Sequence, residues 1–498
     1  MQKIINIEAG VARMPAWRMA EPVNFTTLDG EQIAIVGPNG GGKTMLADII
    51  VGRHPLLLRD PEYDFRPSKR AMVADNIKYI TFRDAYGGDN DRTYYLQQRW
   101  NQMEIDDSTP TVGRKLQEAY DLALRTEGTE PDLLSRQRDH LYRLFNMEPL
   151  LDKPVILLSS GELRKLKLTE TLLAQPRVLI MDNPFIGLDA DTRQQLRELL
   201  GSIAKEGRLQ LILILSKTDD IPPFITHVVE VDYMTVRPKQ TLADYMASRP
   251  GLPAHVLGQA ARDAIVGLPY NHSQYNAREV ARLNKVSIRY GSRTILKDLD
   301  WVVRNGERWA LSGQNGAGKS TLLSLICADN PQSYACDITL FDMPRGTGES
   351  IWDIKRHIGY VSPEMHRAYQ RDIPALRIVA SGLKDSVGLF VKPTDEELRA
   401  CRFWLGIFGL KDKEATTFLK LSSGEQRLVL LARAFVKDPE LIILDEPLHG
   451  LDDRNRRLVK DVIDTFMQRR NKTLIMVTHY AEELPSCIDH KLRLARHQ

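Results

Sequence analysis

The chain has 498 residues, 43% of them hydrophobic, and its 68 Lys and Arg nearly balance its 65 Asp and Glu. This length supports more than one core, because domains usually run about 50 to 250 residues. The net charge of +3 gives no field that would indicate a nucleic-acid partner. Four cysteines without a C-x-x-C pair argue against a zinc site or a redox couple and suit buried positions in a reducing cytoplasm.

The chain shows no membrane-spanning pattern. Its start, MQKIINIEAGVARMPAW, lacks a continuous apolar core of the signal-peptide type, and about 18 consecutive apolar residues occur nowhere. We therefore expect a protein that is soluble by itself in the cytoplasm. Peripheral association with the inner face of the membrane would then need a partner.

The first half opens with an apolar run, Ile33 to Val36, followed by the glycine-rich sequence GPNGGGKT and a helical pattern. A polar stretch from Asp84 to Arg92 precedes a predicted helix from about Val112 to Leu144. The motif LSSGE ends at Glu162, and an apolar strand from Val178 closes on Asp182. A later strand is predicted from Leu211 to Leu215.

A segment rich in Pro and Gly separates the halves, from about Leu242 to Val280. Frequent Pro and Gly residues interrupt regular structure, so this segment is predicted to be a linker with short helical pieces. We expect two domains, residues 1–241 and 281–498, joined by a linker over residues 242–280.

The second half repeats the order of the first. An apolar run from Trp309 precedes GQNGAGKS, the motif LSSGEQ begins at Leu421, and strands are predicted at Leu441 to Glu446 and Thr473 to Val477. The two middle motifs and the two acidic strand ends are each 263 positions apart, whereas the two loop lysines are 276 apart. Strands that alternate with helices predict an α/β fold with a mainly parallel sheet in each half.

Both glycine-rich sequences match the G-x-x-x-x-G-K-[ST] pattern between a strand and a helix, which makes chance unlikely as an explanation of two copies. Small residues let backbone N–H groups surround phosphates at the positive end of the next helix. The lysines would hold the β- and γ-phosphates of ATP, and Thr44 and Ser320 would ligate Mg²⁺. The predicted ATP-binding residues are Gly37, Pro38, Asn39, Gly40, Gly41, Gly42, Lys43, Thr44, Gly313, Gln314, Asn315, Gly316, Ala317, Gly318, Lys319, Ser320 and Thr321.

The combination of phosphate loop, LSSGE motif and acidic strand end resembles the tandem nucleotide-binding domains of the ABC ATPase superfamily. The stretch GESIWDIKRHIGYVS, from Gly348 to Ser362, is similar more narrowly to the molybdenum-transport, photorepair-like group. The resemblance implies that each phosphate loop pairs with the serine-glycine signature of the other half. Site one would combine Gly37–Thr44 and Asp182 with Ser422, Ser423 and Gly424, and site two would combine Gly313–Ser320 and Asp445 with Ser159, Ser160 and Gly161. By itself, an SSG stretch is more often a helix cap, but its position before the acidic strand favours a signature role here.

The resemblance also implies that the two sites are unequal. In the second half, Asp445 would bind Mg²⁺, Glu446 would activate the attacking water and His479 would contact the γ-phosphate, with Lys319 as a further catalytic residue. The first half keeps Asp182 but has Asn183 and Lys217 at the degenerate positions. An amide cannot accept the proton, so site one should retain ATP and site two should hydrolyse it.

Aromatic residues before each loop are candidates for stacking adenine. Tyr290 lies 29 positions before Lys319, and Trp17 lies 26 before Lys43; either residue could instead belong to a core. Asp189 and Asp452 follow GL turns that resemble the loops through which paired domains sense each other, although an Asp there can simply cap a helix.

The family's metal-sensing glutamine has no clear counterpart. Pro363 and Glu364 follow IGYVS, and Phe82 and Arg83 follow IKYIT. Gln97 and Gln98 lie too far along the chain to replace it. The role that this loop has in the family, reaching the metal and transmitting the nucleotide state to a partner, is therefore in question for this chain.

Three functions fit the resemblance. The first is the ATP-hydrolysing subunit of a transporter, with a separate permease as partner and molybdate or a related oxyanion as cargo. The second is a soluble tandem ATPase acting on ribosomes or DNA-repair complexes, for which a basic cluster such as Arg454, Arg456 and Arg457 could contact phosphates, although a solvated helix face explains it too. The third is a regulatory ATP switch. Closure within one chain or as a homodimer is left open.

Overall fold

The computed structural model describes residues 1–82, 109–126, 129–158, 160–186, 188, 190–207, 209–248, 255–269, 275–290, 293–314, 316–368, 372–385, 392–478 and 480–495. The chain divides into two compact units, Met1–Gly251 and Leu252–Gln498. Helix α8 (Leu242–Ser248) falls in the first unit, and helix α9 (Gln259–Val266) falls in the second.

The central sheet of unit 1 has the strand order β10-β8-β3-β7-β6-β5, and β9 pairs with β8. The strands from β8 to β5 run parallel, whereas β9 and β10 run antiparallel to β8. The bounds are β3 Ile33–Val36, β5 Ile77–Thr81, β6 Val178–Asp182, β7 Gln210–Leu215, β8 His227–Asp232, β9 Thr235–Val236 and β10 Gln240–Thr241. Short, continuously apolar strands of this kind suit a sheet that is covered on both faces.

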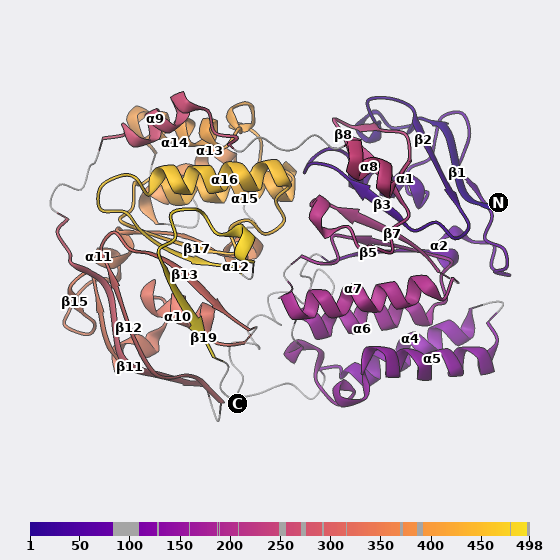
Figure 1. Ribbon diagram of the computed structural model, residues 1–498, viewed down its shortest axis with the longest axis horizontal. Helices are drawn as coiled ribbons and strands as arrows, with labels where there is room; N and C mark the ends of the chain where they lie inside the picture. The colour runs from indigo at the N-terminus through magenta and orange to yellow at the C-terminus, as the bar shows by residue number, and fades with distance from the viewer. Residues whose placement is uncertain are drawn as a thin grey trace. The chain divides into compact units, whose positions relative to one another are not determined.

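Alternate residues of these strands enter two different cores, as the pleat requires. Ile180 and Ile212 pack with helix α1 (Lys43–Ile50). Their neighbours Leu179 and Leu211 join the core beneath helices α6 (Ser160–Leu173) and α7 (Ala190–Lys205). Figure 1 shows α6 and α7 on one side of this sheet and α1 on the other.

Unit 1 also contains a small antiparallel sheet of order β2-β1-β4 and a helical layer beside α6. The remaining bounds are β1 Lys3–Gly10, β2 Val23–Leu28, β4 Glu62–Tyr63, α2 Val73–Asn76, α4 Val112–Arg125 and α5 Pro131–Phe145. The single helix expected from Val112 to Leu144 is therefore wrong. The backbone of Thr126 is extended, so α4 ends there. A new helix begins at Pro131, because proline is well tolerated at the first helical position but not inside a helix.

Unit 2 repeats this plan with a five-stranded parallel sheet of order β16-β17-β18-β13-β19 and an antiparallel sheet of order β12-β11-β14-β15. Figure 1 shows α15 and α16 along one side of the parallel sheet and α10 on the other. The strands are β11 Glu279–Tyr290, β12 Arg293–Arg304, β13 Arg308–Gly313, β14 Asp337–Leu340, β15 Met343–Pro344, β16 Ile358–Val361, β17 Leu441–Asp445, β18 Thr473–Val477 and β19 His490–Leu494. The helices are α10 Lys319–Ile326, α11 Ile351–Lys355, α12 Pro363–Ala368, α13 Ala375–Ser381, α14 Asp395–Ile407, α15 Ser423–Phe435 and α16 Asp453–Phe466.

The segment before β11 packs onto α16. Asp461 accepts hydrogen bonds from the backbone amides of Val256 (2.7 Å) and Leu257 (3.0 Å), and Leu257 and Ile265 belong to the unit 2 core. Arg469 donates to the Ile265 carbonyl at 2.7 Å. This part of the chain between the repeats is thus held by unit 2.

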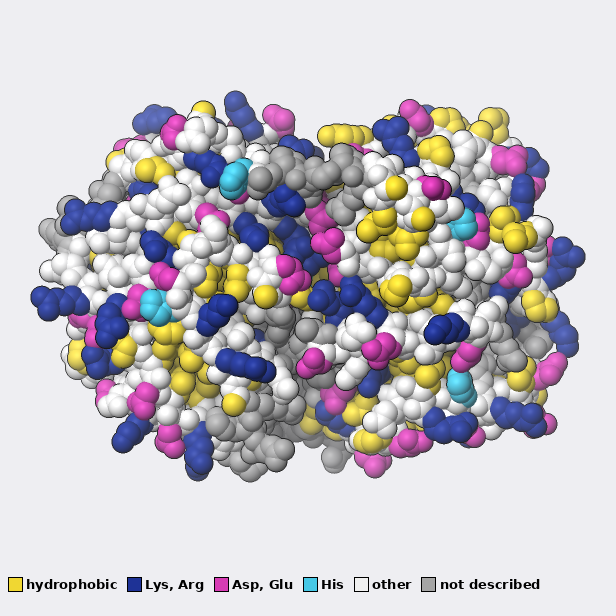
Figure 2. All heavy atoms as spheres, viewed as in Figure 1, with side chains coloured by type: hydrophobic (Ala, Val, Ile, Leu, Met, Phe, Trp, Pro, Cys, Tyr) yellow, Lys and Arg dark blue, Asp and Glu magenta, His cyan; other side chains and the backbone are white. Residues whose placement is uncertain are grey.

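The α/β fold with mainly parallel core sheets is confirmed. Within the described ranges, no helix is both long and apolar enough to span a bilayer. Figure 2 shows Lys and Arg side chains intermixed with Asp and Glu on the face that it presents.

Candidate nucleotide-binding sites

The first phosphate loop joins β3 to α1 in a conformation that needs glycine. Gly37 has φ 150°, and a Cβ there would lie 2.0 Å from the Val231 carbonyl oxygen of β8. Gly42 immediately precedes α1 with φ 106°. A side chain at either position would push the loop out of place, because the left-handed region disfavours other residues and the space is filled.

Lys43, the first residue of α1, folds back over this loop. Its ammonium donates to the carbonyl oxygens of Gly37 and Pro38, both at 2.7 Å, and the residue is 7% exposed. Thr44 is exposed beside it. The Met234 amide donates to the Gly41 carbonyl at 2.9 Å, so the turn between β8 and β9 braces the loop from outside.

The second phosphate loop has the same geometry between β13 and α10. Gly313 has φ 152°, and a Cβ there would lie 2.7 Å from the Leu494 carbonyl oxygen. Lys319 donates to the Gly313 carbonyl at 2.8 Å and to that of Gln314 at 3.1 Å. Ser320 is exposed, as Thr44 is, whereas Asn315 lies outside the described residues.

These loops fit a polyphosphate. In each, the glycine positions are too crowded for side chains, a buried ammonium lies over the backbone, and a helix begins at the loop with its positive end. Bound Mg²⁺ would neutralise phosphate charge, with Thr44 and Asp182, or Ser320 and Asp445, as its side-chain ligands. Among the described residues, no three or more His, Cys, Asp and Glu side chains are grouped so as to hold a metal ion by themselves.

The acidic strand ends lie beside the strand that follows them in each sheet. Asp182 pairs with Ile214, and Asp445 pairs with Val477. In unit 1, the Tyr79 hydroxyl donates to Asp182 Oδ2 at 3.2 Å. Burial and the nearby Asp182 and Asp48 carboxylates raise the pKa of Tyr79, so it remains a donor at neutral pH.

Asn183 and Glu446 share one backbone conformation, with φ of 49° and 48°. Their amides donate to the carbonyls of Ile214 (2.8 Å) and Val477 (2.9 Å), respectively. The side chains differ. Asn183 Nδ2 donates to Asp182 Oδ1 at 2.7 Å, and its Oδ1 accepts from the Ser216 amide at 3.1 Å.

Glu446 instead contacts a histidine: its Oε2 lies 2.9 Å from His449 Nδ1. Lys217, predicted to replace the catalytic histidine in unit 1, is half-buried just before the turn Thr218–Asp220. Its expected counterpart His479 lies outside the described residues. The catalytic and degenerate roles of these residues stay predictions.

The signature motifs begin helices α6 and α15. Ser422 caps α15, since its hydroxyl accepts from the Glu425 amide at 3.3 Å while Glu425 accepts from the Ser422 amide at 2.8 Å. Ser422 thus caps its helix, Ser423 is exposed and Gly424 is buried, and the contact of all three with ATP stays a prediction. Ser160 begins α6, and Ser159 lies outside the described residues.

One pair of residues escaped the sequence analysis. Arg427 donates to the Glu446 carbonyl at 2.7 Å, and Arg164 donates to the Pro184 carbonyl at 2.8 Å. Both arginines are buried and tie the signature helix to the loop after the acidic strand. Their spacing of 263 positions, equal to that of the motifs, was the signal that could have revealed them.

Both aromatic candidates contact the fourth residue after the end of the loop helix. Trp17 lies in a short 3₁₀ turn and stacks on His54 with ring centroids 4.2 Å apart. The Tyr290 hydroxyl accepts from Asn330 Nδ2 at 3.1 Å. His54 and Asn330 are 276 positions apart, as the loop lysines are. Adenine stacking on either ring stays a prediction.

The described residues just after β5 and β16 contact the signature helix of their own unit in different ways. In unit 2, helix α12 starts directly at Pro363, and its His366 Nε2 lies 2.9 Å from Gln426 Oε1 of the signature helix. In unit 1, the Arg164 guanidinium lies over the Phe82 ring, 5.3 Å from its centroid. Glu364 lies in α12, whereas Arg83, Gln97 and Gln98 lie outside the described residues.

Two of the sequence candidates have structural partners. Asp452 caps α16, accepting from the Asn455 amide at 2.8 Å, while Asp189 lies outside the described residues. Arg456, from the basic cluster with Arg454 and Arg457, pairs with the buried Glu483 at 2.6 Å. The positive charge of Arg456 is therefore paired within the folded unit.

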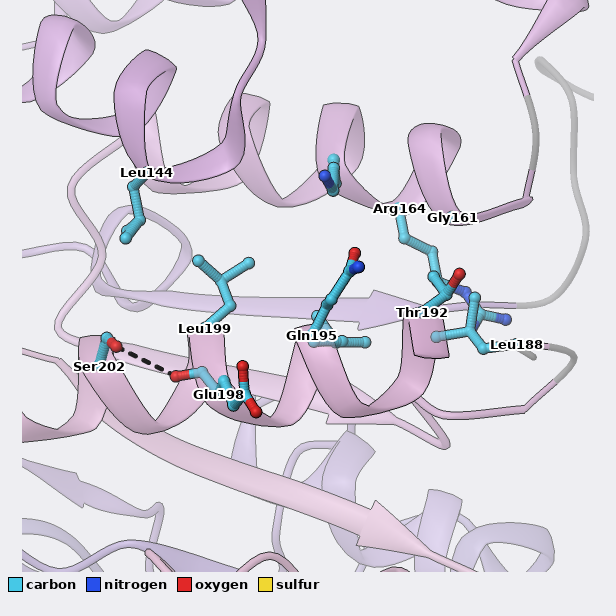
Figure 3. A pocket seen from close by; sticks show the side chains of 11 residues that line it. Leu144, Gly161, Arg164, Leu188, Thr192, Gln195, Glu198, Leu199 and Ser202 are labelled. Carbon is cyan, nitrogen blue, oxygen red and sulfur yellow. Dashed lines mark hydrogen bonds between the residues drawn. The ribbon is translucent and has the colours of Figure 1, made fainter. Parts of the chain in front are cut away.

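A cavity of about 310 Å³ lies between α6 and α7, beside the end of α5. Figure 3 shows Gly161 and Arg164 on one side of it and Gln195 and Leu199 on the other. No phosphate-loop residue lines this cavity, but Gly161 of the first signature, which is predicted to belong to site two, lies at its edge.

A family model described as ABC transporter matches residues 20–186 and 296–449. These stretches contain both phosphate loops, both signatures and both acidic strand ends. The chain therefore belongs to the ABC transporter family, as an ATP-binding protein with two tandem nucleotide-binding domains.

Among the curated relatives is the ABC transporter ATP-binding protein ModF of Escherichia coli (strain K12). It is 35% identical, over 98% of this chain and 96% of its own. An uncharacterized ABC transporter ATP-binding protein of Schizosaccharomyces pombe, C323.04, is 29% identical over 97% and 95% of the two chains.

Solved structures share the fold at low identity. The complex of archaeal ribosomal stalk protein aP1 with the ribosome recycling factor aABCE1 matches 97% of this chain and 87% of that one, with a TM-score of 0.55 and 17% identity. A structure titled RNase-L Inhibitor matches 93% and 83%, with a TM-score of 0.52 and 17% identity.

Proposed function

We propose that this protein is the ATP-binding and ATP-hydrolysing subunit of an ABC-type transport system, with one hydrolytic and one ATP-retaining site. A separate permease would be its membrane partner, which would place the protein at the inner face of the membrane. Molybdate or a related oxyanion is the cargo that the narrower resemblance suggests. ATP and Mg²⁺ are the required ligands.

The unequal sites follow from the contrast between Asn183 and Glu446 on matching backbone. Glu446 can accept a proton from water, whereas Asn183 uses its amide to bridge Asp182 and the Ser216 backbone. A positioned general base contributes about 10²- to 10⁴-fold, or roughly 3 to 5 kcal/mol of barrier. A site without one would hold ATP for longer.

The relatives support the assignment as an ABC ATP-binding protein more strongly than the role in transport. ModF and the yeast protein carry names of ABC transporter ATP-binding proteins and span nearly the same length as this chain. Pairing of each phosphate loop with the signature of the other unit is part of the proposal.

The kinetic test is a pair of substitutions at the matching positions. We expect Glu446→Gln to lower kcat by 10²-fold or more, because it removes the proton acceptor while keeping shape. We expect Asn183→Ala to change kcat by less than about 3-fold, since no base is lost. Phosphate release at saturating ATP measures kcat for both variants. Equal losses of kcat would refute the proposal that the two sites are unequal.

The transport part is tested by partner capture. Glu446→Gln should stall the ATP-bound state, so crosslinking and pulldown from membrane and soluble fractions should recover an integral membrane protein. Recovery of ribosomal or DNA-repair proteins instead would make the transport assignment wrong, while leaving ATP hydrolysis untouched.

A further inference from the structure

His449 is the third residue after Glu446, and a tight turn brings the two together. The His449 amide donates to the Glu446 carbonyl at 3.1 Å, and His449 Nδ1 lies 2.9 Å from Glu446 Oε2. The two side chains are 16% and 21% exposed. A carboxylate can only accept, so Nδ1 is the donor in this hydrogen bond.

The backbone of Glu446 is held from three directions. Its amide donates to Val477 of β18, and its carbonyl accepts from both Arg427 and the His449 amide. With φ at 48°, this residue has little backbone freedom left. The direction of the carboxylate then depends on its own rotatable bonds, which His449 restrains through Oε2.

Unit 1 keeps the turn but not the histidine. The Ile186 amide donates to the Asn183 carbonyl at 3.3 Å, matching the turn of unit 2, and Ile186 occupies the position of His449. Asn183 is oriented instead by Asp182 and Ser216. The histidine thus accompanies the glutamate and is replaced by an apolar residue where the glutamate is absent.

We propose that His449 is a positioning residue for ATP hydrolysis, which donates to Glu446 Oε2 and so orients the carboxylate that accepts the proton of the attacking water. The inference rests on the proposed function of Glu446 as the general base. In the step, the water oxygen forms a bond to the γ-phosphorus as the bond to the leaving ADP oxygen breaks, and the water proton passes to Glu446. His449 keeps its own proton throughout.

The principal test compares His449→Ile, which installs the residue of unit 1, with His449→Asn, whose Nδ2 can take the place of Nδ1. We expect His449→Ile to lower kcat by about 10- to 100-fold with KM for ATP changed less than about 2-fold, because misplaced groups cost this much in rate. His449→Asn should keep most of the activity. Ile186→His is the matched control and should leave kcat unchanged.

A double substitution shows whether His449 acts through Glu446. In a Glu446→Gln background, His449→Ile should cause no further loss, since residues that act as a unit are not additive. A full further loss would overturn the inference, as would unchanged or raised kcat in His449→Ile, or equal losses in His449→Ile and His449→Asn. Unfolding midpoints of all variants check that each one is folded.

The two proposals fail differently. If Glu446→Gln hydrolyses ATP as the unchanged protein does, the proposed function of site two is wrong. If Glu446→Gln is inactive while His449→Ile is fully active, only the positioning role of His449 is wrong.

Discussion

The Asn183 side chain ties the end of β6 to the chain just after β7. Its Nδ2 donates to the Asp182 carboxylate and its Oδ1 accepts from the Ser216 amide. An aspartate of the same shape could keep the second bond but not the first. Asn183 therefore cannot act as a general base, but its Nδ2 donates a hydrogen bond that helps to hold the end of β6 in place.

Asn183→Asp should accordingly destabilise the protein. The new carboxylate would keep the bond from the Ser216 amide, but its other oxygen would face Asp182 with like charge where Asn183 Nδ2 now donates, and we expect the free energy of unfolding to fall by about 1 to 3 kcal/mol at pH 7. Urea unfolding measures the change. Asn146→Asp is the control, because Asn146 has a similar φ of 50° but is exposed at the end of α5; equal effects at both positions would contradict this account.

At the scale of single elements, the chain between the repeats is attached to α16 chiefly by Asp461. This carboxylate is buried and accepts from two backbone amides and from His255 Nδ1 at 3.0 Å. Burial by itself would raise the pKa of Asp461, but the Leu257 amide, His255 and the Val256 amide outweigh it and lower that pKa. The ionised form is the one that holds the segment.

We expect Asp461→Ala to loosen residues 255–268, with a cost of about 1 to 3 kcal/mol from donors left without an acceptor. Because the folded-state pKa is lowered, the attachment is fully present above the unfolded value of about 4 and is lost as the pH falls through the folded value. Limited proteolysis at neutral pH and hydrogen exchange between pH 3 and 6 measure this. Glu198→Ala, at the matching but exposed position of α7, should have no such effect.

At the scale of the whole molecule, each unit has its own cores and its own phosphate loop. Leu257 and Ile265 lie before the repeat of unit 2 begins, yet both are buried within that unit. The stable piece should therefore start near residue 252 and not at residue 281.

A fragment of residues 252–498 should be more stable than a fragment of residues 281–498. Burial of two large aliphatic side chains is worth up to about 3 to 6 kcal/mol. Equilibrium unfolding of the two fragments in urea would show the difference, and equal stabilities would mean that the segment contributes nothing to the unit 2 core.

The sequence predicted the repeated α/β plan, the position of both phosphate loops and the acidic ends of β6 and β17. These features are local, since a glycine-rich loop, a lysine and the following helix are neighbours in the chain. The predicted helix ran across the break between α4 and α5, although the polar stretch between them contains Gly128 and ends at Pro131, both of which are signals for a helix boundary.

The sequence by itself thus determined that this is a tandem nucleotide-binding protein with one intact and one altered acidic end. Only the tertiary structure decided that His449 contacts Glu446, that Trp17 stacks on His54, and that Asp461 holds Val256, 205 positions away. The physical reason is that spacing encodes which residues share a loop or a helix face. Hydrogen bonds between distant segments instead depend on how the turns and layers come together, which no local pattern records.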